Sequence, residues 1–329
     1  MAGFPTTRLR RLRYNSTLRD MLAGVELRRE ELIAPLFVRE GKNQQRPIAS
    51  MPGQNQFSVD TALETVKRWK NKGLRAVLLF GVVEKKDEFG SRAFSPDAPV
   101  QRLTAEIKAG LPEMLVIADT CLCEYTSHGH CGVVKPVGPD AMDVDNDETL
   151  ALLARTAVSQ ARAGADLVAP SAMMDGQVGA IRQALDQAGL HRTGILSYAV
   201  KFASSLYGPF REAAESPPQF GDRRSYQMDY RSPAQALAEA RADVEEGADI
   251  LMVKPALTYL DVIAEIRRAF DLPLAAYHVS GEYAQIKAAA ANGWLDEQAV
   301  VLETTSAVKR AGADLIITYF AENLAEWLG

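Results

Sequence analysis

From about residue 31 to its end, the chain repeats one arrangement of apolar and polar positions. Each repeat is an amphipathic helical stretch, a small turn and a short run of apolar residues. Four turns are alike, each with a glycine just before the apolar run: 72–75 (KGLR), 163–166 (AGAD), 246–249 (EGAD) and 311–314 (AGAD). Glycine often ends a helix in the left-handed conformation, and a continuous apolar run is typical of a strand buried on both faces.

The apolar runs predict eight strands that alternate with helices. They cover residues 33–38, 76–80, 115–119, 166–170, 194–200, 249–254, 274–280 and 314–320. Eight strands with helices between them favour an α/β fold, a (β/α)8 TIM barrel. A doubly wound parallel sheet is the alternative, but no G-x-G-x-x-G motif follows any of these runs.

Three segments differ in expected role. Residues 1–30 carry the basic stretch RLRRLRYN and little apolar periodicity, so we expect an N-terminal arm that makes intersubunit contacts. Residues 31–329 are expected to form a single (β/α)8 catalytic barrel. Within it, residues 203–232 are rich in glycine and proline, and a loop of that length is typical of an active-site lid.

Composition restricts the possible partners. The 329 residues are 47% hydrophobic and carry a net charge of −5, and no basic patch follows the arm. We therefore expect no nucleic-acid partner. We also expect no membrane partner, because no apolar run is long enough to span a bilayer. An odd number of clustered cysteines and the lack of a signal-peptide pattern fit a reducing, cytoplasmic location.

The three cysteines lie within eleven residues, as Cys121, Cys123 and Cys131, directly after a predicted strand. Three thiolates leave one position of a tetrahedral zinc open, as in catalytic zinc sites. The alternative is three reduced cysteines packed as small hydrophobes. His128 and His130 lie beside the thiols, where they could bind metal or backbone, and we assign neither. The acidic run at 140–148 is interpreted as a solvated loop.

Two lysines at strand ends give a second indication of chemistry. Lys201 and Lys254 each end an apolar run. Burial and a second cation lower the pKa of an amine, and a neutral amine can attack a carbonyl to form a Schiff base. The alternative is a lysine that extends out of the barrel rim or pairs with a carboxylate.

Other polar residues are expected near these lysines because active-site groups of such barrels come from the C-terminal strand ends. They are Asp119, Ser171, Tyr198, Ser280 and Tyr319. The predicted lid adds Arg211, Arg223, Arg224 and Gln227. Arginines bind carboxylates through paired hydrogen bonds, so the lid indicates an anionic substrate, although these arginines are also compatible with ordinary surface charge.

Several longer motifs are distributed along the chain: DTCLCEYTSHGHCG, APSAMMDGQV, KFASSLYGPFREA, GDRRSYQM, LMVKPALTYLD and YHVSGEYA. In these it resembles the porphobilinogen synthase (5-aminolevulinate dehydratase) family, of the zinc-using bacterial type. The resemblance implies a hydro-lyase of tetrapyrrole (haem) biosynthesis. Such an enzyme condenses two molecules of 5-aminolevulinate to porphobilinogen with loss of two waters. It also implies a homo-octamer.

The resemblance further implies a role for each matched residue. Lys254 and Lys201 would form Schiff bases with the substrates that become the propionate and acetate sides, and Cys121, Cys123 and Cys131 would bind Zn²⁺. The implied substrate contacts are Ser280 and Tyr319 for one carboxylate, Arg211, Arg223 and Gln227 on the lid, and Asp119 and Ser171 near the amines, with Tyr198 as a further candidate. Glu239 aligns with a ligand of an allosteric Mg²⁺. The stretch after Gly132 is longer than in many zinc-using members.

Two rival functions remain open at this point. A class I aldolase-like barrel would use one lysine and would need no zinc. A non-catalytic metal-binding barrel would bind metal through the thiols but would leave both lysines and the lid arginines without a role.

Overall fold

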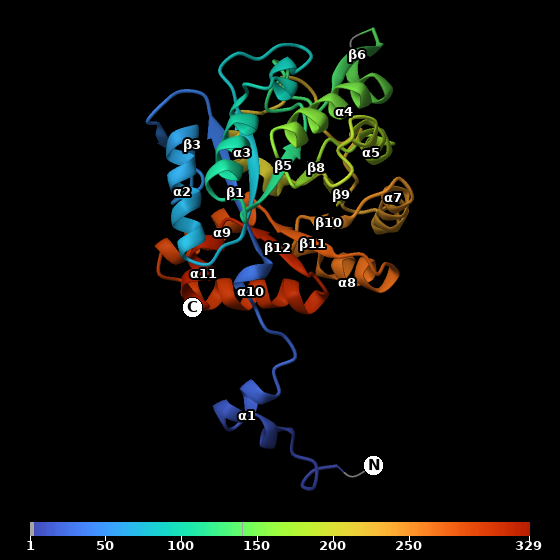
Figure 1. Cartoon of the computed structure of the whole chain (residues 1–329). Coiled ribbons are helices and arrows are strands. Elements are labelled where there is room, and N and C mark those ends of the chain that lie inside the picture. The colour runs from blue at the N-terminus through green and yellow to red at the C-terminus, as the bar shows by residue number, and fades with distance from the viewer. Residues whose placement is uncertain (1–2, 140) are drawn as a thin grey trace.

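The computed structural model describes residues 3–139 and 141–329 and shows a closed barrel of eight parallel strands (Figure 1). Consecutive barrel strands pair with each other, and the last pairs with the first, so the eight strands close into a barrel. In order they are β1 (Leu32–Arg39), β4 (Ala76–Val82), β5 (Leu115–Thr120), β8 (Leu167–Pro170), β9 (Gly194–Lys201), β10 (Ile250–Lys254), β11 (Leu274–His278) and β12 (Leu315–Thr318). The predicted TIM barrel is confirmed, and the doubly wound alternative is wrong.

Helices surround the strands and bury one face each against them. They are α2 (Val59–Asn71), α3 (Pro99–Gly110), α4 (Asn146–Arg162), α5 (Gln177–Gln187), α7 (Pro233–Glu245), α8 (Leu260–Ala269), α9 (Ser280–Ala291), α10 (Glu297–Ala311) and α11 (Ala321–Trp327). In α2 the buried residues Val59, Ala62, Val66 and Trp69 recur every three or four positions, which is the spacing of one helix face.

Short strands lie outside the barrel. β2 (Gln45–Pro47) and β3 (Asn55–Ser58) continue the sheet beside β1. β6 (Val133–Gly138) and β7 (Ala141–Asp145) form an antiparallel hairpin. The acidic run at 140–148 is therefore not a loop throughout, because its first half pairs with β6 and its second half begins α4, which the Asp145 side chain caps. Residue 140 lies outside the described part of the chain.

Strand β9 contains a bulge opposite β10. Leu251 pairs with Ser197, but Val253 pairs with Val200 and Lys254 with Lys201, so β9 has one extra residue between these points. A bulge of this kind changes the direction in which the following side chains point. It brings Lys201 level with Lys254 at the ends of two neighbouring strands.

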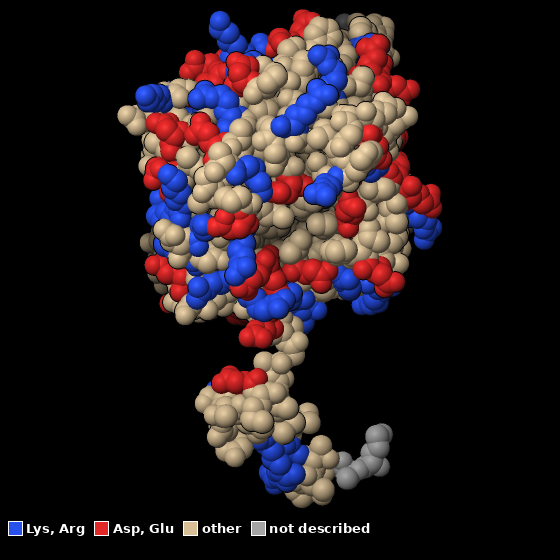
Figure 2. All heavy atoms as spheres, viewed as in Figure 1, with Lys and Arg blue, Asp and Glu red and all other residues tan. Residues whose placement is uncertain are grey.

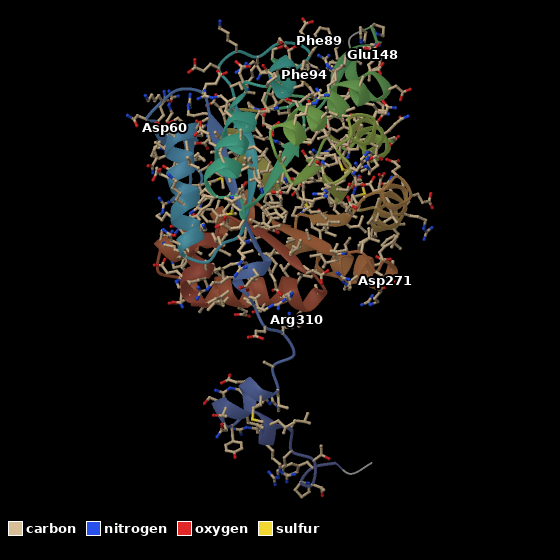
Figure 3. All side chains as sticks on the ribbon, viewed as in Figure 1. Asp60, Phe89, Phe94, Glu148, Asp271 and Arg310 are labelled. Carbon is tan, nitrogen blue, oxygen red and sulfur yellow. The ribbon has the colours of Figure 1, made fainter. Side chains whose placement is uncertain are left out.

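The two ends of the barrel can be distinguished in Figure 3. Phe89, which follows β4, and Glu148, which follows the hairpin, lie at one end, whereas Asp271 and Arg310, which precede β11 and β12, lie at the other. The first end is the C-terminal face, where the candidate residues gather.

The N-terminal segment, residues 3–31, extends away from the barrel past α10 (Figure 1). It contains η1 (Leu9–Leu12), α1 (Ser16–Met21) and η2 (Arg29–Glu31). Apolar side chains on it are exposed, including Phe4 at 78% and Tyr14 at 80%. Its contacts with a neighbouring subunit stay a prediction.

The distribution of charged side chains and the character of the helices are consistent with the composition of the chain. Lys and Arg alternate with Asp and Glu over the barrel face in view (Figure 2). Among the helices of the described residues, none combines the length and the apolar character that crossing a bilayer requires.

Candidate active site

Lys201 and Lys254 are neighbours in the mouth of the barrel. They are paired in register at the ends of β9 and β10, and each is 5% exposed. Burial, and after it the positive charge of Lys201, lowers the pKa of Lys254 to about 7. A large share of Lys254 is therefore a neutral amine near neutral pH, which is the nucleophilic form. The Lys201 ammonium donates a hydrogen bond to the carbonyl oxygen of Ser171.

Aromatic rings surround the Lys254 ammonium. Its Nζ lies 4.3 Å from the ring centre of Tyr277 and 5.1 Å from those of Tyr198, Tyr207 and Phe210. Rings attract the cation through their negative faces, but they supply no carboxylate that would hold the proton firmly. The cage fixes the amine in place and keeps water away from it.

Asp119 and Ser171 meet beside the lysines. The Ser171 hydroxyl donates to Asp119 Oδ2 at 3.0 Å. Burial, and after it the negative charge of Glu124, raises the pKa of Asp119 well above its usual range. Asp119 Oδ1 and the hydroxyl of Tyr198 are buried without a hydrogen-bond partner among the described residues. Such groups are costly unless a ligand satisfies them, so this wall of the site fits a polar substrate.

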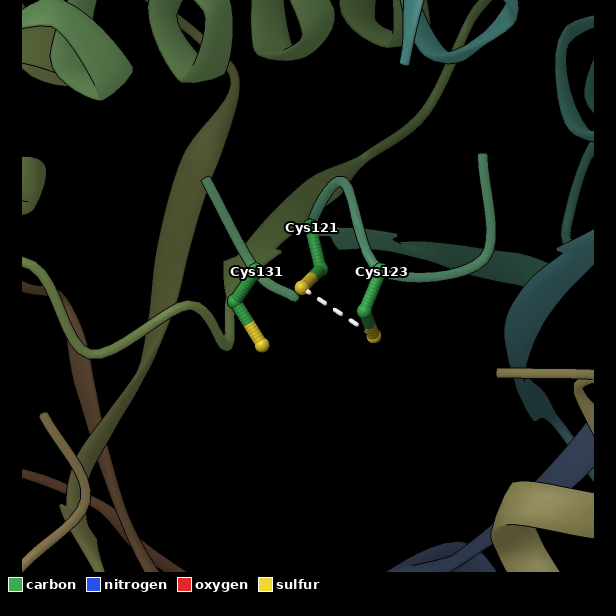
Figure 4. Close-up of side chains that lie close together, drawn as sticks. All are labelled: Cys121, Cys123 and Cys131. Carbon is green, nitrogen blue, oxygen red and sulfur yellow. Dashed lines mark hydrogen bonds between the residues drawn. The ribbon is translucent and has the colours of Figure 1, made fainter. Parts of the chain in front are cut away.

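The three cysteines converge in a buried cluster directly after β5 (Figure 4). Their sulfur atoms lie within 4.8 Å of one another, and Cys121 Sγ lies 3.5 Å from Cys123 Sγ. Tetrahedral zinc with Zn–S bonds of about 2.3 Å places its sulfur ligands roughly 3.8 Å apart. The cluster therefore fits a zinc ion in both donor type and spacing.

Two of the thiols differ in the direction of their pKa shifts. Burial raises the pKa of the Cys121 thiol, whereas hydrogen bonds with the thiols of Cys121 and Cys123 lower the pKa of Cys131. The thiolate is the form that binds metal. Glu124, which the sequence interpretation overlooked, is buried beside the cluster, accepts a hydrogen bond from Cys123 and has its pKa raised by burial to about 8.

The predicted lid covers the site with its polar groups turned inward. It begins with η4 (Ser205–Tyr207) and α6 (Gly208–Ala213) and continues as irregular chain to residue 232. Arg223 is 6% exposed, and its guanidinium donates to the carbonyl oxygens of Gly129 and Ser216, both at 2.8 Å. Arg211 Nε, Arg223 Nε and Gln227 Nε2 are buried donors without an acceptor among the described residues. Arg224, in contrast, is exposed.

The lid rests on the histidine segment of the cysteine loop. The amide of Gln219 donates to the carbonyl oxygen of His128 at 3.0 Å. Both ring nitrogens of His130 are occupied, Nδ1 by the Tyr226 hydroxyl at 3.1 Å and Nε2 by the carbonyl oxygen of Phe220 at 3.0 Å. In this arrangement the ring of His130 serves the lid, in agreement with leaving it out of the metal ligands.

Ser280 and Tyr319 lie in the site but not on strands. Ser280 is the first residue of α9, and Tyr319 follows the end of β12, so the predicted strands were two residues too long. The Ser280 hydroxyl accepts from the amide of Phe210 at 3.0 Å and donates to the carbonyl oxygen of Leu206 at 3.2 Å. The Tyr319 hydroxyl lies 3.1 Å from that of Tyr277. Both hydroxyls are thus held at the C-terminal end of the barrel.

Glu239 lies apart from the lysines, on α7. It lines a hollow of about 350 Å³ together with Asp143, Asp175 and the lid residues 224–229. Burial, and after it the charges of Asp175 and Glu246, raises the pKa of Glu239. Several carboxylates and Arg224 of the lid thus line this hollow together.

Comparisons with known proteins agree with this geometry. The family model for delta-aminolevulinic acid dehydratase matches residues 6–327. Curated proteins of that name from Synechococcus elongatus and Bacillus subtilis are 53% and 52% identical, over 99% and 98% of both chains. One from Archaeoglobus fulgidus is 52% identical over the whole of both chains. The crystal structure of delta-aminolevulinic acid dehydratase (porphobilinogen synthase) from Toxoplasma gondii ME49, in complex with the reaction product porphobilinogen, is similar with a TM-score of 0.94 and 44% identity, covering 98% of this chain and 91% of that one.

Proposed function

This chain belongs to the delta-aminolevulinic acid dehydratase family and is a porphobilinogen-forming hydro-lyase, and we propose that it works through Schiff bases on Lys201 and Lys254. Its substrate is then 5-aminolevulinate, two molecules of which give porphobilinogen and two waters. Neither the aldolase-like nor the non-catalytic alternative accounts for family identity over nearly the whole chain.

The proposal is carried by one observation, the two lysines in register at the barrel mouth. A substrate that must join to a second copy of itself needs two anchoring points, and two anchored substrates react as an intramolecular pair. Each amine attacks a ketone carbonyl, and loss of water leaves an imine. The protonated imine withdraws electrons from the neighbouring carbon, which can then lose a proton and form the C–C bond. The amino group of one substrate then displaces the lysine on the other and forms the C–N bond of the ring, and the second lysine leaves by elimination, so both are regenerated as amines.

The remaining residues are proposed to hold the carboxylates and amines. The hydroxyls of Ser280 and Tyr319 bind one carboxylate, and Arg211, Arg223 and Gln227 bind the other from the lid. The unpartnered donors on the lid support this, because a buried N–H without an acceptor is destabilising until an anion reaches it. Asp119 and Ser171, with Tyr198, face the amino groups and can accept or return their protons.

Cys121, Cys123 and Cys131 are proposed to hold Zn²⁺, and a bound zinc supplies Lewis-acid stabilisation of negative charge on a substrate oxygen. The support is the spacing and burial of the thiols. Glu239 is proposed as a ligand of an allosteric Mg²⁺ next to the lid, in the hollow that it lines with Asp143 and Asp175. The exposed arm is proposed to pack on neighbouring barrels of a cytoplasmic homo-octamer, since its apolar side chains have no cover within the single chain.

Borohydride trapping tests the central step. The protein is incubated with 5-aminolevulinate, reduced, digested and analysed by mass spectrometry, with a sample reduced before substrate is added as the control. We expect stable adducts on the peptides that contain Lys254 and Lys201. A folded, zinc-loaded sample with both lysines unmodified would refute the Schiff-base mechanism.

A further inference from the structure

A buried glutamate connects the two strand ends that hold Lys254 and Ser280. Glu282 lies in the first turn of α9 and is 1% exposed. Its Oε2 accepts a hydrogen bond from the amide of Val279, and its Oε1 accepts one from the amide of Leu257, each at 2.7 Å. Val279 directly precedes Ser280, and Leu257 lies three residues after Lys254. One carboxylate thus bridges β10 and β11 at the level of the site.

Helix capping alone does not explain this arrangement. A glutamate in the first turn commonly accepts from the amide before its own helix, and such residues normally lie at the surface. Here the second oxygen reaches across to a different strand end. The amides of Ala256 and Thr258 also favour the charged form of Glu282, against burial, which raises its pKa to about 7. Burying a carboxylate is costly unless several donors hold it, and here four backbone amides do so.

The same junction also holds the first residues of the lid, 206–210, which we call the lid root. The Tyr207 hydroxyl donates to the carbonyl oxygen of Lys254 at 3.3 Å, and Ser280 binds both Leu206 and Phe210. Gly281 lies so close that a Cβ placed there would approach the carbonyl oxygen of Leu206 to 2.5 Å. Lys254, Ser280 and the lid root therefore meet on the first turn of α9, with Glu282 as the connection to the Lys254 loop.

We infer that Glu282 is a positioning residue that sets the spacing between the Lys254 amine and the Ser280 hydroxyl. The inference rests on the proposed Schiff base at Lys254. In 5-aminolevulinate the ketone carbon and the carboxylate are separated by two methylene groups, so the amine and the carboxylate contact must be a fixed distance apart. Among the described residues, the hydrogen bonds of Glu282 reach the Lys254 loop and the turn before Ser280 but not Lys201, so loss of Glu282 should affect the Lys254 substrate first.

Glu282→Gln keeps the size of the side chain but turns an N–H₂ group towards one of the two amides, which breaks one half of the bridge. Glu282→Asp keeps the charge but is one methylene shorter, so it cannot reach both amides. Glu31→Gln is the matched control. Glu31 is also buried and bound on two sides, by Arg28 and Lys309, but it lies at the N-terminal end of β1.

The readout is the ratio of borohydride-trapped 5-aminolevulinate on Lys254 to that on Lys201, at limiting substrate, beside kcat, KM and Tm. In Glu282→Gln we expect this ratio to fall about ten-fold, the scale of a misplacement of under 1 Å, with KM raised, while Glu31→Gln loses Tm but keeps the ratio. An unchanged ratio in Glu282→Gln, or in Glu282→Asp if the Gln variant does not fold, would overturn the inference. Absence of both adducts in the unsubstituted protein would instead overturn the proposed function.

Discussion

A single methyl group added at Gly129 should push the lid away from the cysteine loop on which it rests. Gly129 lies between the two histidines of the cysteine loop, with φ at +72°. A Cβ there would approach the carbonyl oxygen of Pro217, on the lid, to 2.4 Å. Because that neighbour is backbone, it cannot rotate away, and either the lid or the loop must move.

The size of the effect follows from the contact. Carbon and oxygen atoms in close contact stay about 3.3 Å apart, so Gly129→Ala displaces the lid by roughly 1 Å. That displacement weakens the bond from Arg223 to the Gly129 carbonyl oxygen. Misplacement of about 1 Å can cost about 100-fold in rate, so we expect kcat/KM for porphobilinogen formation to fall between about 10-fold and 100-fold.

Backbone strain is controlled separately by Gly189→Ala. Gly189 has φ at +75°, and a Cβ there meets nothing within 4 Å. Both variants should lose about 1–2 kcal/mol of stability from the left-handed conformation, but only Gly129→Ala should lose activity and become more sensitive to trypsin at Arg223 and Arg224. Equal activity of the two variants would show that the contact between the lid and the Gly129 segment is not needed for catalysis.

Four further results are expected. Lys254→Ala should abolish turnover, and near-normal porphobilinogen formation by a folded variant would contradict the lysine assignment. Under the proposed mechanism Lys254 attacks the substrate as the neutral amine, so kcat/KM should rise as the pH passes about 7, and a flat profile from pH 6 to 8 would argue against this. With its folded pKa below the unfolded value, Lys254 also makes folding more favourable as the pH rises from about 7 towards 10.5, which denaturant titrations can measure. Removing zinc with a chelator should stop turnover and expose Cys121, Cys123 and Cys131 to oxidation, with recovery on adding Zn²⁺ before oxidation but not after; activity that survives chelation and oxidant together would exclude a zinc requirement.

The barrel could be predicted because its signal is local. A strand buried on both faces has a continuous apolar sequence, and such sequences occur in all eight strands. The ends were less accurate, since Ser280 begins a helix directly after β11 and Tyr319 belongs to the turn after β12. Apolar character cannot distinguish the last residue of a strand from a buried residue just beyond it.

The lysines and cysteines could also be predicted, because a charged or metal-binding residue at the end of an apolar run is rare. The aromatic cage could not. Tyr207, Phe210 and Tyr277 come from the lid root and from β11, and each resembles an ordinary core residue in the sequence. Glu124 could have been found from its position next to Cys123. Glu282 gave only the signal of a helix cap, and its second role depends on a loop 25 residues away.

The bulge in β9 makes chain length part of the active site. Tyr198 and Lys201 are three residues apart, a spacing that puts side chains on opposite faces of a regular strand. Yet both are buried in the site, with the Lys201 ammonium 5.4 Å from the Tyr198 ring. One further residue inserted beside Ala199 would place Lys201 four positions after Tyr198 around the bulge, which turns Lys201 outward, towards the helices, although no side chain of the site had been removed. The number of residues between Tyr198 and the end of β9 thus matters as much as their identity, and single insertions there should be poorly tolerated even when every residue of the site is kept.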